Sequence, residues 1–344
     1  YVELQTGDIS DGGLVQPPWT KEQRHFALDK APLRIVKGYP GSGKTTALMQ
    51  AVDCRAGERV LYLTWSTELT AAATSHFDTF ASRDTEVIAR PFPYLISFLL
   101  GQKWGEQRAS VINFPSGPFQ RFRDAVSKVP DKTLGPWSGH LPELYGEMRA
   151  HLVGAALADR PKTLKSKHQP RLSDAAYKAL RGDELGREEI RAVLKVASLV
   201  DQHTKGSIEA CFPALSRAFA ASVRLLNAPL PDNLGRIDRL AIDEVQDLTP
   251  VEALVPILLA RKLAERHPEK RLPYLQVGGD EGQTVRPTGF EWGWFKDLIT
   301  ERLHHNPTEV TLPANMRCPK RIAGLVNKCR TLYRNIDKGE RPDG

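Results

Sequence analysis

Four short apolar runs, each followed by turn residues, are the clearest pattern along the chain. They cover residues 33–36, 59–64, 239–243 and 274–277. Runs of this length are typical of strands that are buried on both faces of a parallel sheet. Apolar residues at helical spacing follow the strands, in residues 44–54, 68–80 and 250–265. This alternation predicts an α/β fold in which helices cover both faces of a parallel sheet.

Residues 101–232 interrupt the alternation. Helical patterns fill most of this range, at residues 142–157, 173–180, 187–201 and 208–226. Little of it resembles a strand. We therefore predict a mostly helical subdomain at residues 101–232, inserted into a discontinuous α/β domain made of residues 1–100 and 233–344.

The positive charge of the chain is concentrated in the same range. The whole chain carries a formal net charge of +7 at pH 7, and residues 101–232 hold 20 Lys and Arg against 14 Asp and Glu. Six of the seven excess positive charges therefore lie there. A basic region of this kind permits a polyanionic partner.

The remaining composition bears on the setting of the protein. No run of about 18 apolar residues occurs, so we expect no membrane span. The four cysteines, Cys54, Cys211, Cys318 and Cys329, show no CxxC spacing. They argue against a zinc site or a disulfide framework, and they favour a reducing, intracellular setting such as the cytoplasm, the nucleoid or the nucleus.

The strongest motif is a glycine-rich loop at residues 38–45. Its sequence, Gly-Tyr-Pro-Gly-Ser-Gly-Lys-Thr, matches GxxxxGK[ST] in full and lies between a predicted strand and a predicted helix. In such a loop the backbone N–H groups turn inward around a phosphate, and the start of the helix adds partial positive charge. We expect Lys44 to reach the β- and γ-phosphates of ATP and the Thr45 hydroxyl to bind Mg²⁺. The predicted nucleotide-binding residues here are Gly38, Gly41, Ser42, Gly43, Lys44, Thr45 and Thr46.

An acidic pair, Asp243 and Glu244, follows the third predicted strand. A site that holds MgATP needs a carboxylate for the metal and a group that activates water. We predict that Asp243 binds Mg²⁺ together with Thr45 and that Glu244 is the general base. For the pair taken alone, two solvated carboxylates are the alternative.

The order of motifs resembles that of the UvrD/Rep/PcrA-like superfamily 1 helicases. The matching segments are residues 19–23, 38–45, 63–67, 243–247, 277–284 and 315–319. Asp-Glu-Val-Gln-Asp at 243–247 is similar to the family's DExQD box, and 277–284 resembles its GDxxQ(S/T) motif. The resemblance covers roughly residues 19–329. It implies a RecA-like P-loop NTPase domain that uses ATP and Mg²⁺ to move along single-stranded DNA, usually from 3′ to 5′.

The resemblance also implies roles for single residues. Gln23 would read the adenine edge, and Gln283 would sense the γ-phosphate. Arg317 would contact the γ-phosphate, for which a planar guanidinium is well suited. Gln283 and Arg317, together with Lys44 and Glu244, form the predicted catalytic set.

Candidate nucleic-acid contacts fall in two parts of the chain. Thr64 lies in the segment that resembles a family motif touching single strands. Phe92 occupies the place of another such motif and departs from it, so a stacking face and a core aromatic are both open. In the basic stretch 160–171 we expect phosphate contacts, with a solvated loop as the alternative. The residues concerned are Lys162, Lys165, Lys167 and Arg171.

Two features depart from the family. Members usually carry an aromatic-rich, base-stacking stretch after the GDxxQ(S/T) motif. In residues 285–292 the candidates to replace those aromatics are Phe290 and Trp292, which stand in a shifted register. The chain also begins at Tyr1 and ends at Gly344, soon after the segment of Arg317. We therefore expect a second RecA-like domain in the full-length protein, and weak activity from this part alone.

Three other functions remain open. A nucleotide-gated ATPase switch that moves no strand fits the altered stretch 285–292. An RNA helicase of the same superfamily is possible because no residue identifies the 2′-hydroxyl. A small-molecule kinase shares the glycine loop, but it has no reason to carry the motifs at 243–247 and 277–284.

Overall fold

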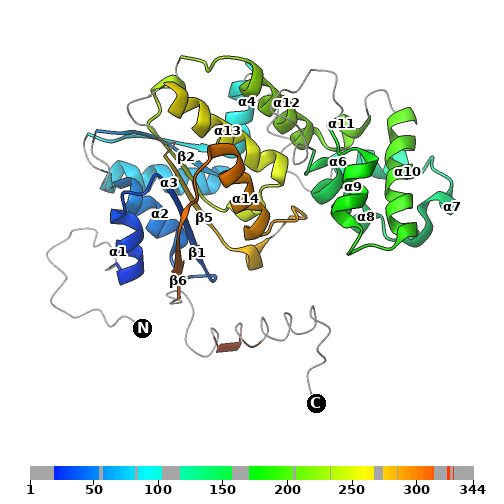
Figure 1. The fold of residues 1–344 in the computed structure, drawn as a ribbon, viewed down its shortest axis with the longest axis horizontal. Coiled ribbons are helices and arrows are strands. Elements are labelled where there is room, and N and C mark those ends of the chain that lie inside the picture. Colours follow the sequence, from blue (N-terminus) through cyan, green and yellow to red (C-terminus); the bar gives the residue numbers. More distant parts are fainter. Residues whose placement is uncertain are drawn as a thin grey trace.

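The computed structural model describes residues 19–53, 57–81, 84–102, 117–156, 170–203, 207–232, 234–266, 274–284, 286–313, 324–325 and 328. Its strands form one six-stranded sheet in the order β3-β2-β4-β5-β1-β6, and every neighbouring pair is parallel (Figure 1). The strands are β1 (Leu33–Gly38), β2 (Arg59–Thr64), β3 (Glu86–Pro91), β4 (Arg239–Ile242), β5 (Leu275–Gly279) and β6 (Thr308–Leu312). The prediction of an α/β fold with a parallel sheet is confirmed.

The four predicted strands are β1, β2, β4 and β5, which form the middle of the sheet. The sequence patterns missed β3 and β6, the two edge strands. Exposed positions are mixed with buried ones along both of them, and the longest apolar run, residues 87–89 of β3, has only three residues. Edge strands pack less of their surface than central ones, and their sequences are correspondingly more polar.

Two buried clusters lie on the two faces of the sheet. Successive side chains of a strand point to opposite faces. In β2, Val60 and Tyr62 join the smaller cluster, whereas Leu61 and Leu63 join the larger one. The smaller cluster is covered by α1 (Lys21–Leu28), α2 (Lys44–Asp53) and α3 (Thr67–Phe80). The larger is covered by α4 (Phe92–Leu99), α12 (Pro213–Asn227), α13 (Pro250–Arg266) and α14 (Trp292–Leu303).

Further helices separate β3 from β4 in the chain. We call α6 to α11 the helical segment. It comprises α6 (Gly117–Val126), α7 (Asp131–Leu134), η1 (Gly135–Trp137), α8 (Leu141–Glu147), the π-helix η2 (Met148–Val153), α9 (Asp174–Arg181), α10 (Arg187–His203) and α11 (Ser207–Cys211). Figure 1 shows it beyond one end of the sheet, in green. The short 3₁₀ helices η3 (Leu234–Arg236), η4 (Val245–Asp247) and η6 (Glu281–Gln283) lie in the connections around β4 and β5.

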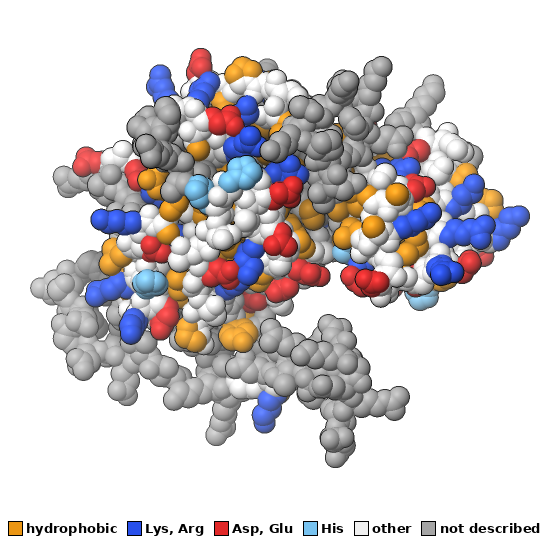
Figure 2. Space-filling view, in the orientation of Figure 1, with side chains coloured by type: hydrophobic (Ala, Val, Ile, Leu, Met, Phe, Trp, Pro, Cys, Tyr) orange, Lys and Arg blue, Asp and Glu red, His pale blue; other side chains and the backbone are white. Residues whose placement is uncertain are grey.

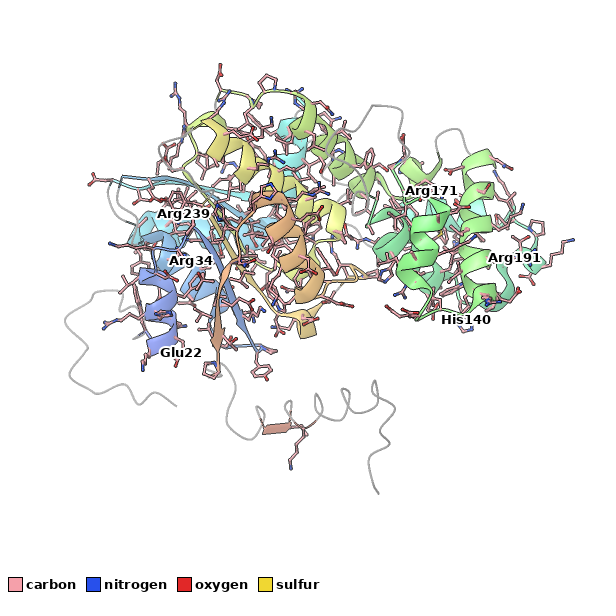
Figure 3. All side chains as sticks on the ribbon, viewed as in Figure 1. Glu22, Arg34, His140, Arg171, Arg191 and Arg239 are labelled. Atoms are coloured by element: carbon pink, nitrogen blue, oxygen red, sulfur yellow. The ribbon has the colours of Figure 1, made fainter. Side chains whose placement is uncertain are left out.

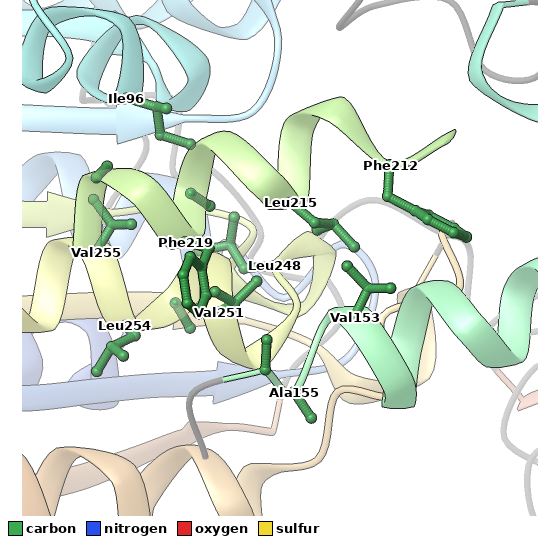
Figure 4. Close-up of a cluster of buried hydrophobic side chains, with 14 of the residues drawn as sticks. Ile96, Val153, Ala155, Phe212, Leu215, Phe219, Leu248, Val251, Leu254 and Val255 are labelled. Carbon is green, nitrogen blue, oxygen red and sulfur yellow. The ribbon is translucent and has the colours of Figure 1, made fainter. Parts of the chain in front are cut away.

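Packing between the helical segment and the sheet is continuous. The predicted helix 208–226 is interrupted at Phe212 and becomes α11 and α12, because Pro213 begins the second of them. Of the two, α12 packs against α13 and α4. Figure 4 shows Phe219 of α12 beside Val251 and Leu254 of α13, and the larger cluster extends from there through Val153 into the helical segment. Packing therefore marks no boundary at residue 232.

Among the described residues, no helix is both long and apolar enough to cross a lipid bilayer. The longest, α10 and α13, have 17 residues each, and both carry charged side chains.

Candidate active site

The glycine loop connects β1 to α2, as predicted. Gly41 and Gly43 have φ angles of 74° and 83°, which glycine adopts at little cost. A Cβ on Gly38 would lie 2.3 Å from Ser42 Oγ. At these positions the tight path of the loop, rather than side-chain chemistry, requires glycine.

Lys44 is the first residue of α2, and its side chain, only 7% exposed, reaches back to the start of this loop. Its ammonium donates to the carbonyl oxygens of Gly38 at 3.0 Å and Tyr39 at 3.2 Å, and lies 3.8 Å from Asp280 Oδ2. The nearby Ser42 hydroxyl is buried and makes no hydrogen bond to any described residue. Unsatisfied buried polar atoms are costly. A cradle with a buried cation and a spare hydroxyl could hold an anion such as a phosphate.

The acidic pair begins where β4 ends. Asp243 is 4% exposed and accepts hydrogen bonds from the Tyr62 hydroxyl at 3.1 Å and from the Glu244 N–H at 3.0 Å. The Thr45 side chain also hydrogen-bonds it, which joins the acidic pair to the glycine loop. Burial, reinforced by the neighbouring Glu244 charge, raises the pKa of Asp243 above its usual range, and these hydrogen bonds oppose the rise. Burial likewise raises the pKa of Tyr62.

Thr45 and Asp243 could hold a magnesium ion. Mg²⁺ prefers oxygen ligands, and it is commonly bound by one or two protein oxygens with phosphate oxygens and water completing the shell. A hydroxyl and a buried carboxylate that interact with each other, beside the loop that surrounds the Lys44 ammonium, fit that requirement. A divalent cation would also relieve the repulsion between Asp243 and Glu244 that contributes to the raised pKa of Asp243.

Glu244 has a left-handed backbone conformation, with φ 56° and ψ 45°. Non-glycine residues seldom adopt this conformation, and it is most often retained where a side chain must be aimed. Here it directs the Glu244 carboxylate so that Oε2 accepts a 2.6 Å hydrogen bond from Gln246 Nε2. The rest of the side chain is only half-buried.

Gln246 connects the acidic pair to the end of β5. Its Oε1 accepts from the backbone N–H of Asp280 at 3.1 Å, and its backbone carbonyl accepts from the Thr288 hydroxyl at 2.8 Å. Gln283 in turn donates to Asp280 Oδ2 at 2.6 Å, the same oxygen that lies near Lys44. The predicted catalytic residues Lys44, Glu244 and Gln283 thus belong to one connected network.

Sequence reasoning gave no role to three members of this network. Tyr62 occupies an ordinary strand position, and nothing in the sequence marks its hydroxyl as a partner of Asp243. Thr288 lies in an irregular stretch without a motif. Asp280 could have been found, because it stands inside the segment 277–284 that was already singled out.

Gly279 provides a test of this network. A Cβ there would lie 2.8 Å from both Gln246 Oε1 and Val245 Cγ1. We expect Gly279→Ala to lower the free energy of unfolding by about 1–3 kcal/mol, as overpacking usually does, and to displace Gln246. Chemical denaturation measures this effect.

Gly293 is the matched control, because a Cβ there meets nothing within 4 Å. It lies in α14, where alanine is preferred to glycine by about 0.5–1 kcal/mol. Gly293→Ala should therefore leave stability unchanged or raise it. Equal denaturation midpoints for Gly279→Ala and the unsubstituted protein would contradict the packing described for Gln246.

Gln23 lies beside the loop but makes other contacts. It is 2% exposed and completes a capping box at the start of α1, where its Oε1 accepts from the Thr20 N–H at 3.0 Å. Its Nε2 donates to the Gly43 carbonyl at 3.3 Å. Both ends of the amide that was expected to read adenine are thus engaged within the protein, and they tie α1 to the glycine loop.

The aromatic candidates for nucleic-acid contact are buried. Phe92 is 1% exposed, and its ring stacks on Trp65 at 5.8 Å, which fits the core-aromatic alternative. Phe290 and Trp292 are 5% and 9% exposed and pack against each other. None of the three presents a free face to a base. Thr64 is also buried, at the end of β2 beside β4, and its hydroxyl has no hydrogen-bond partner among the described residues.

Of the four charged candidates for nucleic-acid contact, Arg171 lies among the described residues. Arg171 lies 3.1 Å from Asp174 and 3.7 Å from Asp201, so its guanidinium is shared between two carboxylates. Lys162, Lys165, Lys167 and Arg317 lie outside the described residues.

The helical segment contacts the network through its π-helix. Arg149 of η2 is 7% exposed, donates to the Pro287 carbonyl at 2.7 Å and lies 3.7 Å from Glu252. Pro287 precedes Thr288, which donates to Gln246. π-helical turns are rare and frequently lie at functional sites.

The carboxyl ends of β1, β4 and β5 therefore bring together a buried ammonium, a hydroxyl, two adjacent carboxylates and an amide network. Such a set could bind a phosphorylated ligand with a divalent cation and could take a proton from water. Open parallel α/β sheets bind their ligands at this edge. Neither a family model nor a curated protein matches the sequence.

Proposed function

We propose that the chain is the nucleotide-binding part of an ATP-driven motor that moves along single-stranded nucleic acid. The observation that carries this proposal is the network of contacts that runs from the Lys44 ammonium through Asp280 and Gln246 to Glu244. It joins a phosphate cradle to an acidic pair, which is the combination that nucleotide hydrolysis needs. In this proposal the fold is RecA-like, the helical segment belongs to an inserted subdomain, and the protein works inside the cell, where ATP and nucleic acid are present.

Each residue of the network has a role in this proposal. Lys44 would leave the loop carbonyls to bind the β- and γ-phosphates, and Thr45 and Asp243 would hold the metal. Bound Mg²⁺ supplies neutralisation of the charge that develops on the phosphate oxygens. Glu244, steadied by Gln246, would accept the proton of the attacking water.

The network also supports a means of reporting the nucleotide. Lys44 and Gln283 share Asp280, so a phosphate that draws Lys44 away would alter what Gln283 contacts. From Gln246 the connection continues through Thr288 and Pro287 to Arg149 of the helical segment. Movement of a strand requires that hydrolysis change the structure outside the nucleotide site. This series of contacts is suited to transmit such a change. Arg317 and a second RecA-like domain of the full-length protein would complete the site.

A nucleotide-gated switch is the second candidate. The burial of Phe92, Phe290 and Trp292 favours it, because single-strand motors commonly stack bases on exposed aromatic rings. A switch would bind and hydrolyse ATP, but single strands would not change its rate.

The test has two stages. On this chain, binding of a fluorescent ATP analogue should depend on Mg²⁺. If the analogue does not bind, the proposed nucleotide site is wrong. On the full-length protein, ATP hydrolysis should rise when oligo(dT) or oligo(U) is added. A rise with DNA alone identifies a DNA motor, a rise with RNA an RNA motor, and hydrolysis without stimulation the switch.

A further inference from the structure

A hollow lies where the helical segment meets α13 and α14, and none of its lining residues belongs to the network described above. Its cavity volume is about 320 Å³, at the small end of the range for sites that bind small molecules. Residues of η2, α9, α13 and α14 line it, together with Gly289 and Glu291 of the turn before α14. Figure 2 shows acidic side chains on both sides of this junction, with hydrophobic side chains between them.

The buried part of the lining is apolar. It consists mainly of Ala150, Ala155, Leu254 and Leu298, each less than 10% exposed. Leu180 of α9 also lines the hollow, and 47% of its surface is open to solvent. Covering apolar surface of this kind with an apolar ligand is favourable.

The exposed part of the lining is acidic. Four exposed residues contribute carboxylates: Glu184, Glu291, Asp297 and Glu301. Neither Glu291 nor Asp297 forms an ion pair with any residue that the structure describes. Trp294, Asp297 and Glu301 lie on one face of α14, because helix positions three and four residues apart are neighbours. Trp294 is half-buried, and its indole N–H donates to the Gly289 carbonyl at 2.8 Å, which orients the ring.

The positive charge of the lining is already compensated. Arg181, its one cation among the described residues, donates to the two carboxylate oxygens of Glu147 at 2.9 Å and 3.1 Å, and also to Glu184. Burial lowers the pKa of His151, so its ring is neutral at pH 7. The hollow therefore carries net negative charge, and it would repel a phosphate or a nucleic-acid backbone.

Carboxylates and an aromatic ring together are suited to bind organic ammonium and guanidinium ions, through charge attraction and cation–π contact. The apolar lining favours a ligand whose charged group is attached to a hydrocarbon or aromatic body. We propose that this hollow binds a small organic cation, with its charged group near Glu291 and Asp297 and its apolar body against Leu180 and Leu254. The proposal does not depend on nucleotide binding.

The experiment measures the binding of three probes of similar shape to the full chain, without ATP, by ligand-detected NMR. Benzamidine is a cation, benzamide is neutral and benzoate is an anion. We expect a Kd on the order of 1 mM for benzamidine, as is usual for so small a ligand. Benzamide should bind about 10-fold more weakly because it lacks the charge, and benzoate should not bind detectably. Equal affinities for benzamidine and benzamide would overturn the proposal.

A double variant, Glu291→Gln with Asp297→Asn, removes the two unpaired carboxylates. Its affinity for benzamidine should fall about 5- to 10-fold, since each exposed ion pair contributes up to about 5-fold. Its affinity for benzamide should not change, and an unchanged circular dichroism spectrum shows that the variant is folded. Unchanged affinity for benzamidine would contradict the proposed site.

The matched control, Glu22→Gln with Asp78→Asn, removes the same charge from exposed positions of α1 and α3. Figure 3 shows Glu22 at the opposite end of the molecule from the helical segment. The control should bind benzamidine as the unsubstituted chain does. An equal loss in the control would mean that only overall charge matters, and it would overturn the proposal.

The apolar contact has its own pair of variants. Leu180→Ala should weaken benzamidine binding about 3-fold, whereas Leu69→Ala, at a position of α3 that is 41% exposed, should not change it. Equal affinities for the two variants would contradict the placement of the apolar body. A lysine-rich peptide that binds through Glu291 and Asp297 when benzamidine does not would contradict a small-molecule site. Lys44→Ala should bind benzamidine normally, so the hollow can fail without the nucleotide site failing, and the reverse also holds.

Discussion

Lys44→Ala should abolish most nucleotide binding and hydrolysis. The Lys44 ammonium is buried between two loop carbonyls and Asp280, in the middle of the phosphate cradle. A charge-assisted contact to phosphate contributes about 1.5–3 kcal/mol, so MgATP affinity should fall by about 10- to 100-fold. If the ammonium also stabilises charge in the transition state, hydrolysis should fall by a further factor of about 10²–10³.

Lys30→Ala is the control for this prediction, because Lys30 is an exposed lysine that takes no part in the network. Titration with a fluorescent ATP analogue and single-turnover hydrolysis separate binding from chemistry. Lys44→Met, which keeps most of the side-chain volume, guards against loss of packing around the loop. If Lys44→Met bound MgATP as tightly as the unsubstituted chain, the loop would not be a phosphate cradle.

Glu244→Gln should separate hydrolysis from binding. The amide has the shape of the carboxylate and can still meet Gln246, but it cannot accept a proton from water. General-base catalysis contributes about 10²–10⁴ to a rate, so hydrolysis should fall by that factor. MgATP affinity should be retained or should rise, because the substitution removes the negative charge that opposes ionised Asp243.

The same two assays measure this prediction, and Glu301→Gln on the exposed side of α14 is its control. Lys44→Ala and Glu244→Gln therefore predict different patterns: loss of binding with hydrolysis in the first, and loss of hydrolysis alone in the second. A variant at Glu244 that hydrolyses ATP at the original rate would exclude this residue as the base. The candidate base would then be Asp247, the remaining carboxylate of the segment 243–247 besides Asp243.

Much of the nucleotide site could be predicted because its information is local. A loop that must turn backbone N–H groups inward needs glycine at fixed intervals, and the lysine and threonine must follow at once. The strands that carry the site are buried on both faces, so their sequences are continuous apolar runs. For these reasons β1, β2, β4 and β5 were found, and the edge strands β3 and β6, which are half-exposed, were not.

The nucleic-acid contacts were harder to predict than the nucleotide site, because the burial of a side chain depends on the whole fold and not on its neighbours in the sequence. A phenylalanine has the same sequence signature on a surface and in a core, and Phe92 and Phe290 prove to be in the core. Arg171 is a free cation in the sequence, yet it pairs with Asp174 and Asp201, the second of which is 30 positions away.

By itself, the sequence determined the parallel α/β architecture and the position of the glycine loop and of the acidic pair, since each depends on residues that are adjacent in the chain. The tertiary structure alone decided which side chains meet: Tyr62 with Asp243, Lys44 with Asp280, and Arg149 with Pro287. The physical reason is distance along the chain. Hydrogen bonds of this kind form between elements brought together by burial of apolar surface, and no short pattern of residues records which polar atoms that burial will leave facing one another.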